Sequence, residues 1–164
     1  MSEFLVLDSL PSTNEYALNL KNPQHGDSIL AYIQTQGRGQ HGRIWDSQPG
    51  GLYLSIILKD INLDNITFKI GEIVKKYLES LTEKDFDIKL PNDILYNGRK
   101  ICGILVESKT CGKDIWAVCG IGLNLNNENY INLKKIIGDK LDVLAVAKEL
   151  KNRILEEIYC GKDS

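Results

Sequence analysis

The segment TQGRGQHGRIWDSQPGG, residues 35–51, separates two apolar runs, SILAYI at 28–33 and LYLSIIL at 52–58. Both runs are short and rich in β-branched and aromatic residues, which predicts two strands. The segment between them holds five glycines and two arginines. Long glycine-rich connections are uncommon in compact domains and are often functional. We therefore expect a binding loop whose ends are held by two strands.

Residues 37–42 read GRGQHG, which has the G-x-G-x-x-G spacing of a dinucleotide-binding turn. That turn needs a helix directly after it, so that the helix N-terminus can bind the pyrophosphate. Here PGG at 49–51 and a second predicted strand follow instead, which argues against a dinucleotide site. A plain surface loop with solvated arginines remains the structural alternative.

The strand pattern around this loop predicts an antiparallel meander. Residues 3–8 and 86–90 favour strands, and the latter run breaks at a proline. Asn97-Gly98 is a strong signal for a hairpin turn, and a second hairpin is predicted to turn at 111–114. Sequential hairpins produce antiparallel pairing. The expected fold class is α+β, with a mixed, largely antiparallel central sheet packed by helices.

Three helices are predicted from apolar spacing and from capping signals. Apolar residues recur at helical intervals over 65–78 and over 141–159. Ser12 followed three residues later by Glu15 forms a capping box, so a helix should begin there and run towards Lys21. Capping alone is a sufficient reason for the polar residues at this helix start.

Composition and charge exclude several classes of protein. The 164 residues are 26% charged and 43% hydrophobic, which predicts one globular domain spanning 1–164. A net charge of −2 gives no basic surface for nucleic acid. No apolar run approaches a membrane span, and no signal peptide is recognised. We expect a cytoplasmic protein that binds neither nucleic acid nor membrane.

The four cysteines are predicted to be reduced and structural. Cys102, Cys111, Cys119 and Cys160 have spacings that fit no zinc site. Cys102 and Cys119 lie in apolar runs, where a thiol behaves as a small hydrophobe. Trp116 lies in the same kind of run and is expected in the core.

Four ordered blocks carry a resemblance to a known family. They are STN at 12–14, GRGQHGRIW at 37–45, KLPND at 89–93 with KICGILVE at 100–107, and GIGLN at 120–124. The set resembles biotin protein ligases (biotin–[acetyl-CoA-carboxylase] ligases), whose pattern is GRGR-x-GR-x-W, KWPND with a later lysine and GIL-x-E, then GIG-x-N. The resemblance implies the class II synthetase-like biotin/lipoate ligase fold.

The resemblance also implies a two-step reaction. The biotin carboxylate attacks the α-phosphate of MgATP and gives biotinoyl-5′-AMP and pyrophosphate. A lysine on a carboxylase acceptor domain, or biotin carboxyl carrier protein, then attacks the mixed anhydride and releases AMP. Biotin and ATP are substrates, Mg²⁺ accompanies ATP, and no tightly bound prosthetic group is expected. A homodimer through a sheet edge is a further expectation by analogy.

The matching positions define the expected site. Two anions must meet, so fixed positive charge is needed between them. By the resemblance the catalytic residues are Lys100, Arg38 and Asp93, with Asp93 also the candidate Mg²⁺ ligand. The biotin-binding positions are Ser12, Thr13, Asn14, Gln34, Gly37, Arg38, Gly39, Lys100, Gly103 and Ile104. The ATP- and adenylate-binding positions are Arg38, Gln40, Arg43, Trp45, Asn92, Lys100, Gly122 and Asn124.

Two of these assignments have a plainer structural alternative, and two have support from side-chain chemistry. Lys100 could be an ordinary lysine of a hairpin, and Asp93 could be a turn former. Trp45 offers an apolar face for adenine, and Asn124 the donor and acceptor that an adenine edge needs. For the chain as a whole, the alternatives are a lipoate–protein ligase and a biotin- or biotinoyl-AMP-binding module with weakened catalysis.

The sequence departs from the family pattern at two positions. Gln40 replaces the second arginine of GRGR, which removes a phosphate-facing charge. Leu90 replaces the tryptophan of KWPND, at a position that we expect to serve packing, so the effect should be small. From its length we expect a minimal ligase, with neither the N-terminal helix-turn-helix domain nor the C-terminal SH3-like domain of other members.

Overall fold

The computed structural model describes residues 2–160 and contains one seven-stranded sheet. The strand order is β1-β2-β3-β7-β6-β5-β4. β1 and β2 are parallel, and every other neighbouring pair is antiparallel. The strands are β1 (Phe4–Leu10), β2 (Ser28–Gln34), β3 (Leu52–Lys59), β4 (Asp87–Lys89), β5 (Asp93–Tyr96), β6 (Arg99–Cys111) and β7 (Asp114–Leu123). The predicted α+β class with a mixed, largely antiparallel sheet is confirmed.

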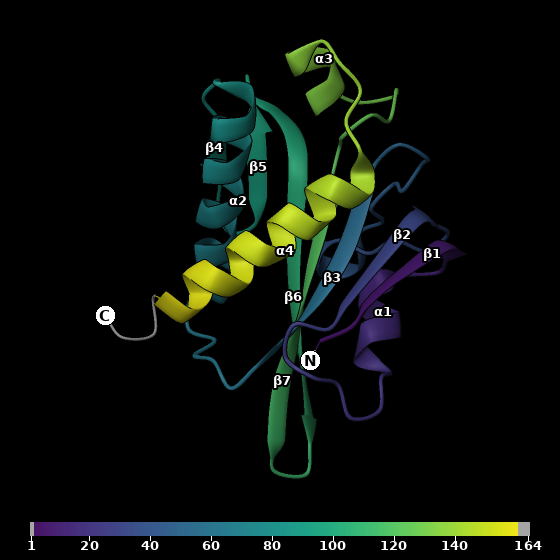
Figure 1. Cartoon of the computed structure of the whole chain (residues 1–164), viewed down its shortest axis with the longest axis vertical. Helices are drawn as coiled ribbons and strands as arrows, with labels where there is room; N and C mark the ends of the chain where they lie inside the picture. Colours follow the sequence, from purple (N-terminus) through teal and green to yellow (C-terminus); the bar gives the residue numbers. More distant parts are fainter. Residues whose placement is uncertain (1, 161–164) are drawn as a thin grey trace.

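Helices pack on the sheet as its apolar patterning requires. They are α1 (Thr13–Leu18), a 3₁₀ turn η1 (Gln40–Gly42), α2 (Ile66–Thr82), α3 (Leu133–Ile137) and α4 (Val143–Cys160). Figure 1 shows α4 crossing the sheet beside α2, with α1 lying near β2 and β3. The main core lies between the sheet and α2 and α4, and a smaller cluster of five buried residues lies under α1.

The local signals in the sequence explain most element boundaries. The Ser12 hydroxyl accepts the N–H of Glu15 at 3.3 Å, as the capping signal predicts, but α1 ends at Leu18 instead of running to Lys21. At the β5–β6 turn, Asn97 and Gly98 have φ values of 50° and 76°. Both values lie in the left-handed region that asparagine and glycine tolerate, so the first predicted hairpin is confirmed.

The other hairpin and the two long helices also lie where the pattern predicts. β6 ends at Cys111 and β7 begins at Asp114. α2 is one turn longer than predicted and α4 matches closely. The five-residue α3 was not predicted, because so short a segment shows no apolar period. Its start is fixed by Asn132, whose side-chain oxygen accepts the N–H of Lys135 at 2.8 Å.

Three of the cysteines are free thiols, as expected. Cys102 and Cys119 are fully buried, and burial raises the pKa of both thiols, that of Cys119 to about 12. Cys111 is exposed at the end of β6, and the side chain of Cys160 lies outside the described residues. Trp116 is 4% exposed, which confirms its place in the core. Across residues 2–160, no helix has the length and apolarity to cross a membrane.

Candidate active site

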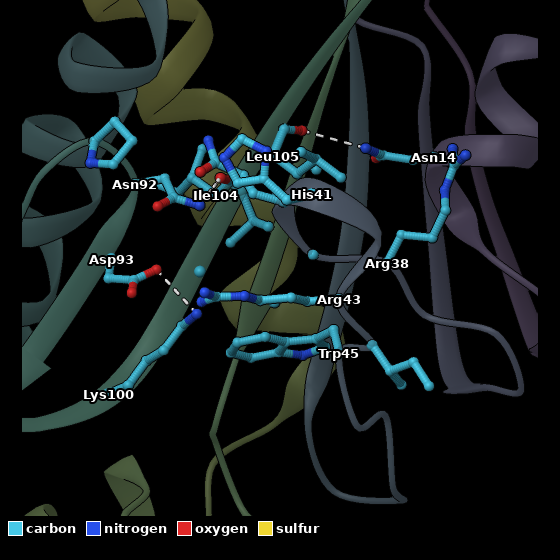
Figure 2. Close-up of a pocket in the computed structure, with 18 of the residues that line it drawn as sticks. Asn14, Arg38, His41, Arg43, Trp45, Asn92, Asp93, Lys100, Ile104 and Leu105 are labelled. Carbon is cyan, nitrogen blue, oxygen red and sulfur yellow. Dashed lines mark hydrogen bonds and ion pairs between the residues drawn. The ribbon is translucent and has the colours of Figure 1, made fainter.

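A cavity of about 390 Å³ opens where four parts of the chain meet: the start of α1, the glycine loop (residues 35–51), the β4–β5 connection, and the first half of β6 with the end of β7. Figure 2 shows the side chains that project into it. The predicted residues that line it are Ser12, Thr13, Asn14, Gln34, Arg38, Gly39, Gln40, Arg43, Trp45, Asn92, Asp93, Lys100, Gly103, Ile104 and Gly122. Residues more than 100 positions apart in the chain are therefore brought together.

One side of the cavity is formed and backed by a hydrogen-bonded set that we call the polar wall: Thr13, Asn14 and Gln34, which line the cavity, and Ser47 and Ser55 behind them. Gln34 Oε1 accepts the Thr13 N–H at 2.8 Å, and Gln34 Nε2 donates to Ser47 Oγ at 2.8 Å. The Ser55 hydroxyl donates to Asn14 Oδ1 at 2.5 Å and lies 2.7 Å from Thr13 Oγ1. Buried polar groups with all partners in place form a rigid surface.

The polar wall depends on a close contact between α1 and β7. A Cβ atom at Gly120 would overlap the side-chain amide of Asn14. Glycine at this position therefore lets α1 lie directly on the strand and fixes the amide that Ser55 and the Leu105 carbonyl bind. Ser55 was not predicted; the signal available was a single hydroxyl inside the apolar run of β3.

The glycine loop folds back on itself over the cavity. Gly39 N–H donates to the Arg43 carbonyl at 2.8 Å, and Trp45 N–H donates to the Gly37 carbonyl at 2.9 Å. A Cβ atom at Gly37 would lie 2.5 Å from both Ser47 Oγ and the Trp45 carbonyl oxygen. Gly37 does not line the cavity. Its contribution is the close packing of the two loop segments, because no larger residue fits between them.

Arg38 and Glu107 form an ion pair across the gap between the loop and β6. Arg38 Nη2 lies 2.9 Å from Glu107 Oε1, and the same oxygen accepts the Asn14 Nδ2 hydrogen at 3.0 Å. Glu107 is the last residue of the GIL-x-E block, and the sequence predicts no role for it. Its partners lie 69 and 93 positions away in the chain, so spacing alone could not indicate them.

Lys100 enters the cavity from the β5–β6 hairpin. Its Nζ atom lies 2.9 Å from Asp93 Oδ1 and 5.0 Å from the centroid of the Trp45 ring. Figure 2 shows this ion pair on the side of the cavity opposite Arg38 and Asn14. The strand pairing of β5 with β6 holds both partners of the pair, because Lys100 is opposite Leu95 and Asp93 is opposite Gly103.

The Trp45 indole lies flat on two glycines. A Cβ atom at Gly103 would come within 3.0 Å of the indole ring, and one at Gly122 would overlap its Nε1 atom. Within the described residues, Nε1 is buried without a hydrogen-bond partner. An unpartnered buried N–H is uncommon, so the close packing of the indole on Gly122 leaves one hydrogen bond unmade.

Two expectations need correction. Asn124 is 4% exposed and does not line the cavity; its amide donates to the Lys100 carbonyl at 3.4 Å and accepts from Asn127 Nδ2 at 3.1 Å. Its amide therefore braces the chain behind Lys100. Leu90 is 68% exposed and lines the cavity, so the expected packing role is wrong. β4 ends at Lys89, which leaves the next residue outside the sheet.

The lining also includes residues that were not predicted: His41, Ile44, Lys89, Leu90, Pro91, Leu105, Gly120 and Ile121. Lysines and arginines contribute four cationic groups to the lining, and Asp93 is the one carboxylate among the described lining residues. This excess of positive charge favours an anionic ligand. His41 has a φ of 55°, in the left-handed region, at the tip of the loop.

The cavity fits a magnesium ion only as part of a phosphate complex. Within residues 2–160, no three His, Cys, Asp or Glu side chains are grouped to hold a metal. Mg²⁺ commonly uses one or two carboxylates together with substrate phosphates and water. Asp93 supplies one such carboxylate, so the residues present fit an ion that arrives with ATP and do not form a separate protein site.

The end of the glycine loop is tied to the segment before α3. The Tyr130 hydroxyl donates to Asp46 Oδ2 at 2.6 Å, and this bond, with a second from Gln48, holds the pKa of Asp46 below its usual value. The Tyr53 hydroxyl donates to the Gln48 carbonyl at 2.6 Å, and burial raises the pKa of Tyr53. The segment after Trp45 is therefore anchored more firmly than the tip of the loop.

Comparison with known proteins agrees with this geometry. A sequence model of the biotin/lipoate A/B protein ligase family matches residues 6–124. The chain belongs to this family. It is similar to the bifunctional ligase/repressor BirA of Bacillus spizizenii, with 34% identity over 169 aligned positions that cover 92% of the chain and 52% of the relative. The chain thus spans about half the length of that relative.

Solved structures of biotin protein ligases share the fold. A biotin protein ligase from Aquifex aeolicus in complex with biotin and ATP superposes with a TM-score of 0.87 at 31% identity, over 100% of this chain and 73% of that one. A biotin acetyl coenzyme A carboxylase synthetase from Helicobacter pylori, with biotinylated ATP bound, gives a TM-score of 0.73 at 25% identity, over 95% and 75% of the two chains.

Proposed function

We propose that this chain activates biotin with ATP to biotinoyl-5′-AMP and transfers the biotinoyl group to a lysine of a carboxylase acceptor domain. The observation that carries the proposal is the meeting of Lys100, Arg38 and the polar wall on one cavity. The similarity to the Aquifex ligase that binds biotin and ATP supports the same assignment. A volume of about 390 Å³ lies in the range of small-molecule sites.

In the first step, a biotin carboxylate oxygen bonds to the α-phosphorus of ATP and the bond to the bridging oxygen of pyrophosphate breaks. Both reactants are anions, so positive charge between them lowers the barrier. Lys100 stands between Asp93 and the Trp45 ring and supplies that charge. Arg38 and Arg43 bind phosphate oxygens from the loop side.

In the second step, the acceptor lysine amine attacks the carbonyl carbon of the anhydride. The amide bond forms, the carbonyl–phosphate bond breaks, and AMP leaves. Asp93 is the carboxylate on the cavity that can accept the proton released by the amine. Its ion pair with Lys100 orients it for this task.

The polar wall supports biotin as the first substrate. A ureido ring has N–H donors and a carbonyl acceptor, and the wall offers hydroxyl and amide groups of both kinds at Thr13, Asn14 and Gln34, with Ser12 beside them. A lipoate–protein ligase is the alternative within the family. The dithiolane ring of lipoate has neither N–H donors nor a carbonyl, so it could not bind these polar groups as a ureido ring can, which disfavours it.

ATP would bring Mg²⁺ bound to its phosphates, and Asp93 is the side chain placed to share it. The ion would neutralise charge on the leaving pyrophosphate. Among the roles assigned from the sequence, that of Gly37 becomes one of loop shape, and that of Asn124 one of bracing Lys100. The remaining predicted residues keep their proposed roles in binding biotin or the adenylate.

A homodimer through the sheet edge also remains a proposal. β1 is an edge strand, and its Leu5 and Val6 are each 37% exposed. Sedimentation at several protein concentrations tests it, and a concentration-independent monomer would reject it.

Pyrophosphate release with biotin or with lipoate, followed by labelling of a purified acceptor domain, tests the function. The expected result is release with biotin and transfer to the acceptor. A biotin-binding module would release no pyrophosphate, and a lipoate ligase would reverse the substrate preference. Either outcome would reject the proposed function.

A further inference from the structure

Glu107 lies outside the cavity lining but contacts two residues that belong to it. Its Oε1 atom accepts hydrogen bonds from Arg38 Nη2 at 2.9 Å and from Asn14 Nδ2 at 3.0 Å. Its side chain is 27% exposed, so water only partly weakens these bonds. The carboxylate therefore links the glycine loop to the polar wall.

Glu107 is itself held in place from two directions. It lies on β6 opposite Val118 of β7, within an uninterrupted run of strand pairing. Asn14, its second partner, is fixed by Ser55 at 2.5 Å and by the Leu105 carbonyl at 3.2 Å. Figure 2 shows the latter bond. A carboxylate fixed in this way can orient a flexible side chain that binds it.

Arg38 depends on this partner for its position. Its side chain is 39% exposed, and both the hydrogen bond and the ion pair that the described residues offer it come from Glu107. Only Nη2 is used. A guanidinium has five N–H donors, so the other nitrogens stay available to an anion in the cavity.

We propose that Glu107 is a positioning residue that holds Arg38 over the cavity for the phosphate group of an acyl-adenylate. The inference rests on the proposed function. An arginine that is already oriented loses less side-chain entropy when the anion binds, which strengthens binding and slows release. If Glu107 only competed with the anion for Arg38, its removal would strengthen anion binding.

Two substitutions separate these cases. Glu107→Ala removes both hydrogen bonds and the charge, whereas Glu107→Gln keeps a carbonyl oxygen that accepts from Arg38 and Asn14. Glu149→Ala is the matched control, because Glu149 also pairs with an arginine, Arg153, at 2.8 Å but lies on α4 away from the cavity. Each protein is titrated with a non-hydrolysable biotinoyl-adenylate analogue, and its melting temperature and pyrophosphate release are measured.

We expect Glu107→Ala to weaken analogue binding about tenfold, as expected for the loss of a hydrogen bond to a charged group, and to raise KM for ATP more than it lowers kcat. Glu107→Gln should recover most of the affinity, and Glu149→Ala should bind as the wild type does. Tighter binding by either Glu107 variant would overturn the inference, as would unchanged binding by Glu107→Ala. A Gln variant as weak as Ala, with an equally lowered melting temperature, would indicate a merely structural role and also overturn it.

The failure of this inference can be told from the failure of the proposed function. Wild-type protein that releases no pyrophosphate would reject the function, whatever the variants bind. Wild-type protein that releases pyrophosphate normally, with an analogue affinity that does not respond to Glu107, would reject the positioning role alone.

Discussion

Lys100 and Arg38 bring positive charge to the same cavity from two very different supports. Each is paired with a carboxylate at 2.9 Å, and their side chains are 42% and 39% exposed. Lys100 stands on a strand that pairs on both sides, whereas Arg38 stands on a loop with two isolated bridges, Gln34–Ser47 at its base and Arg38–Ile44 within it. A rigid support suits a charge that must act at one atom, and an adaptable support suits one that must close over a ligand.

The ion pairs themselves contribute little to folding in either region. Pairs with this degree of exposure are typically worth about 0.2–1 kcal/mol. Breaking either pair should therefore cost little stability. The difference between the two regions lies in the backbone that carries each cation.

The largest effect is expected at the rigid support. Lys100→Ala should lower pyrophosphate release by about 10²–10³-fold, because it removes a preorganised charge from the reacting centre. The melting temperature should change little, since the side chain is half-exposed. Lys113→Ala, on the turn of the other hairpin, is the control and should retain activity. Wild-type pyrophosphate release by folded Lys100→Ala protein would refute the catalytic assignment.

A pair of glycines in the loop tests how adaptable that support is. Gly37→Ala would press a Cβ atom against Ser47 and the Trp45 backbone, whereas at Gly39 the nearest atoms, in Arg43, lie at 3.6 Å. Forcing an extra carbon into a packed position usually costs about 1–3 kcal/mol. The dissociation rate of the adenylate should therefore rise about tenfold in Gly37→Ala and much less in Gly39→Ala. Equal effects of the two substitutions would show that the loop adapts along its whole length.

Amide hydrogen exchange compares the order of the glycine loop with that of β6 directly. Residues 36–45 bury little apolar surface, so ordering them without a ligand is weakly favoured. We expect their amides to exchange faster than those of β6 in the free protein and to become protected with biotin and ATP. Protection that is already equal in both states would exclude ligand-induced ordering.

Gln40→Arg should produce a smaller change. Gln40 lines the cavity from the 3₁₀ turn at the tip of the loop. An added cation there should slow adenylate dissociation severalfold, the scale of one partly exposed charge contact. The measurement is the dissociation rate of the adenylate in the variant against wild type. An unchanged or faster rate would contradict the role given to this position.

The smallest effect is expected from reducing agent. The strand that carries Lys100 and Glu107 also carries Cys102, whose burial raises its thiol pKa and leaves it unreactive. Melting temperature and activity should be the same with and without a reductant. Mass spectrometry of the non-reduced protein that shows loss of two protons would reveal a disulfide and overturn this expectation.

Sequence reasoning worked where the chemistry is local. The hairpin at Asn97-Gly98 was predicted because these two residues tolerate positive φ, and α1 because Ser12 caps its start. The block resemblance predicted most of the cavity lining. Position within a block did not reveal which way a side chain points, so Asn124 and Leu90 were misjudged.

Contacts between distant strands were beyond local patterns. Ser55 binds residues 41 and 42 positions away, and the pairing of Glu107 with Arg38 depends on the order of strands in the sheet. That order places β7 between β3 and β6, an arrangement that turn signals and apolar periods do not encode. The polar wall and its link to the loop could therefore be found only from the structure.

The two tryptophans occupy opposite situations, and this gives the protein an optical reporter of its own. Trp45 lies on the cavity beside Lys100, whereas Trp116 is 4% exposed in the small core under α1. Indole emission responds to nearby charge and solvent, so a ligand that displaces Lys100 or seals the loop changes the fluorescence of Trp45 and leaves that of Trp116 as constant background. Replacement of Trp116 by phenylalanine would leave a single emitter at the cavity. Stopped-flow recording of that variant would follow loop closure in real time, without any attached dye.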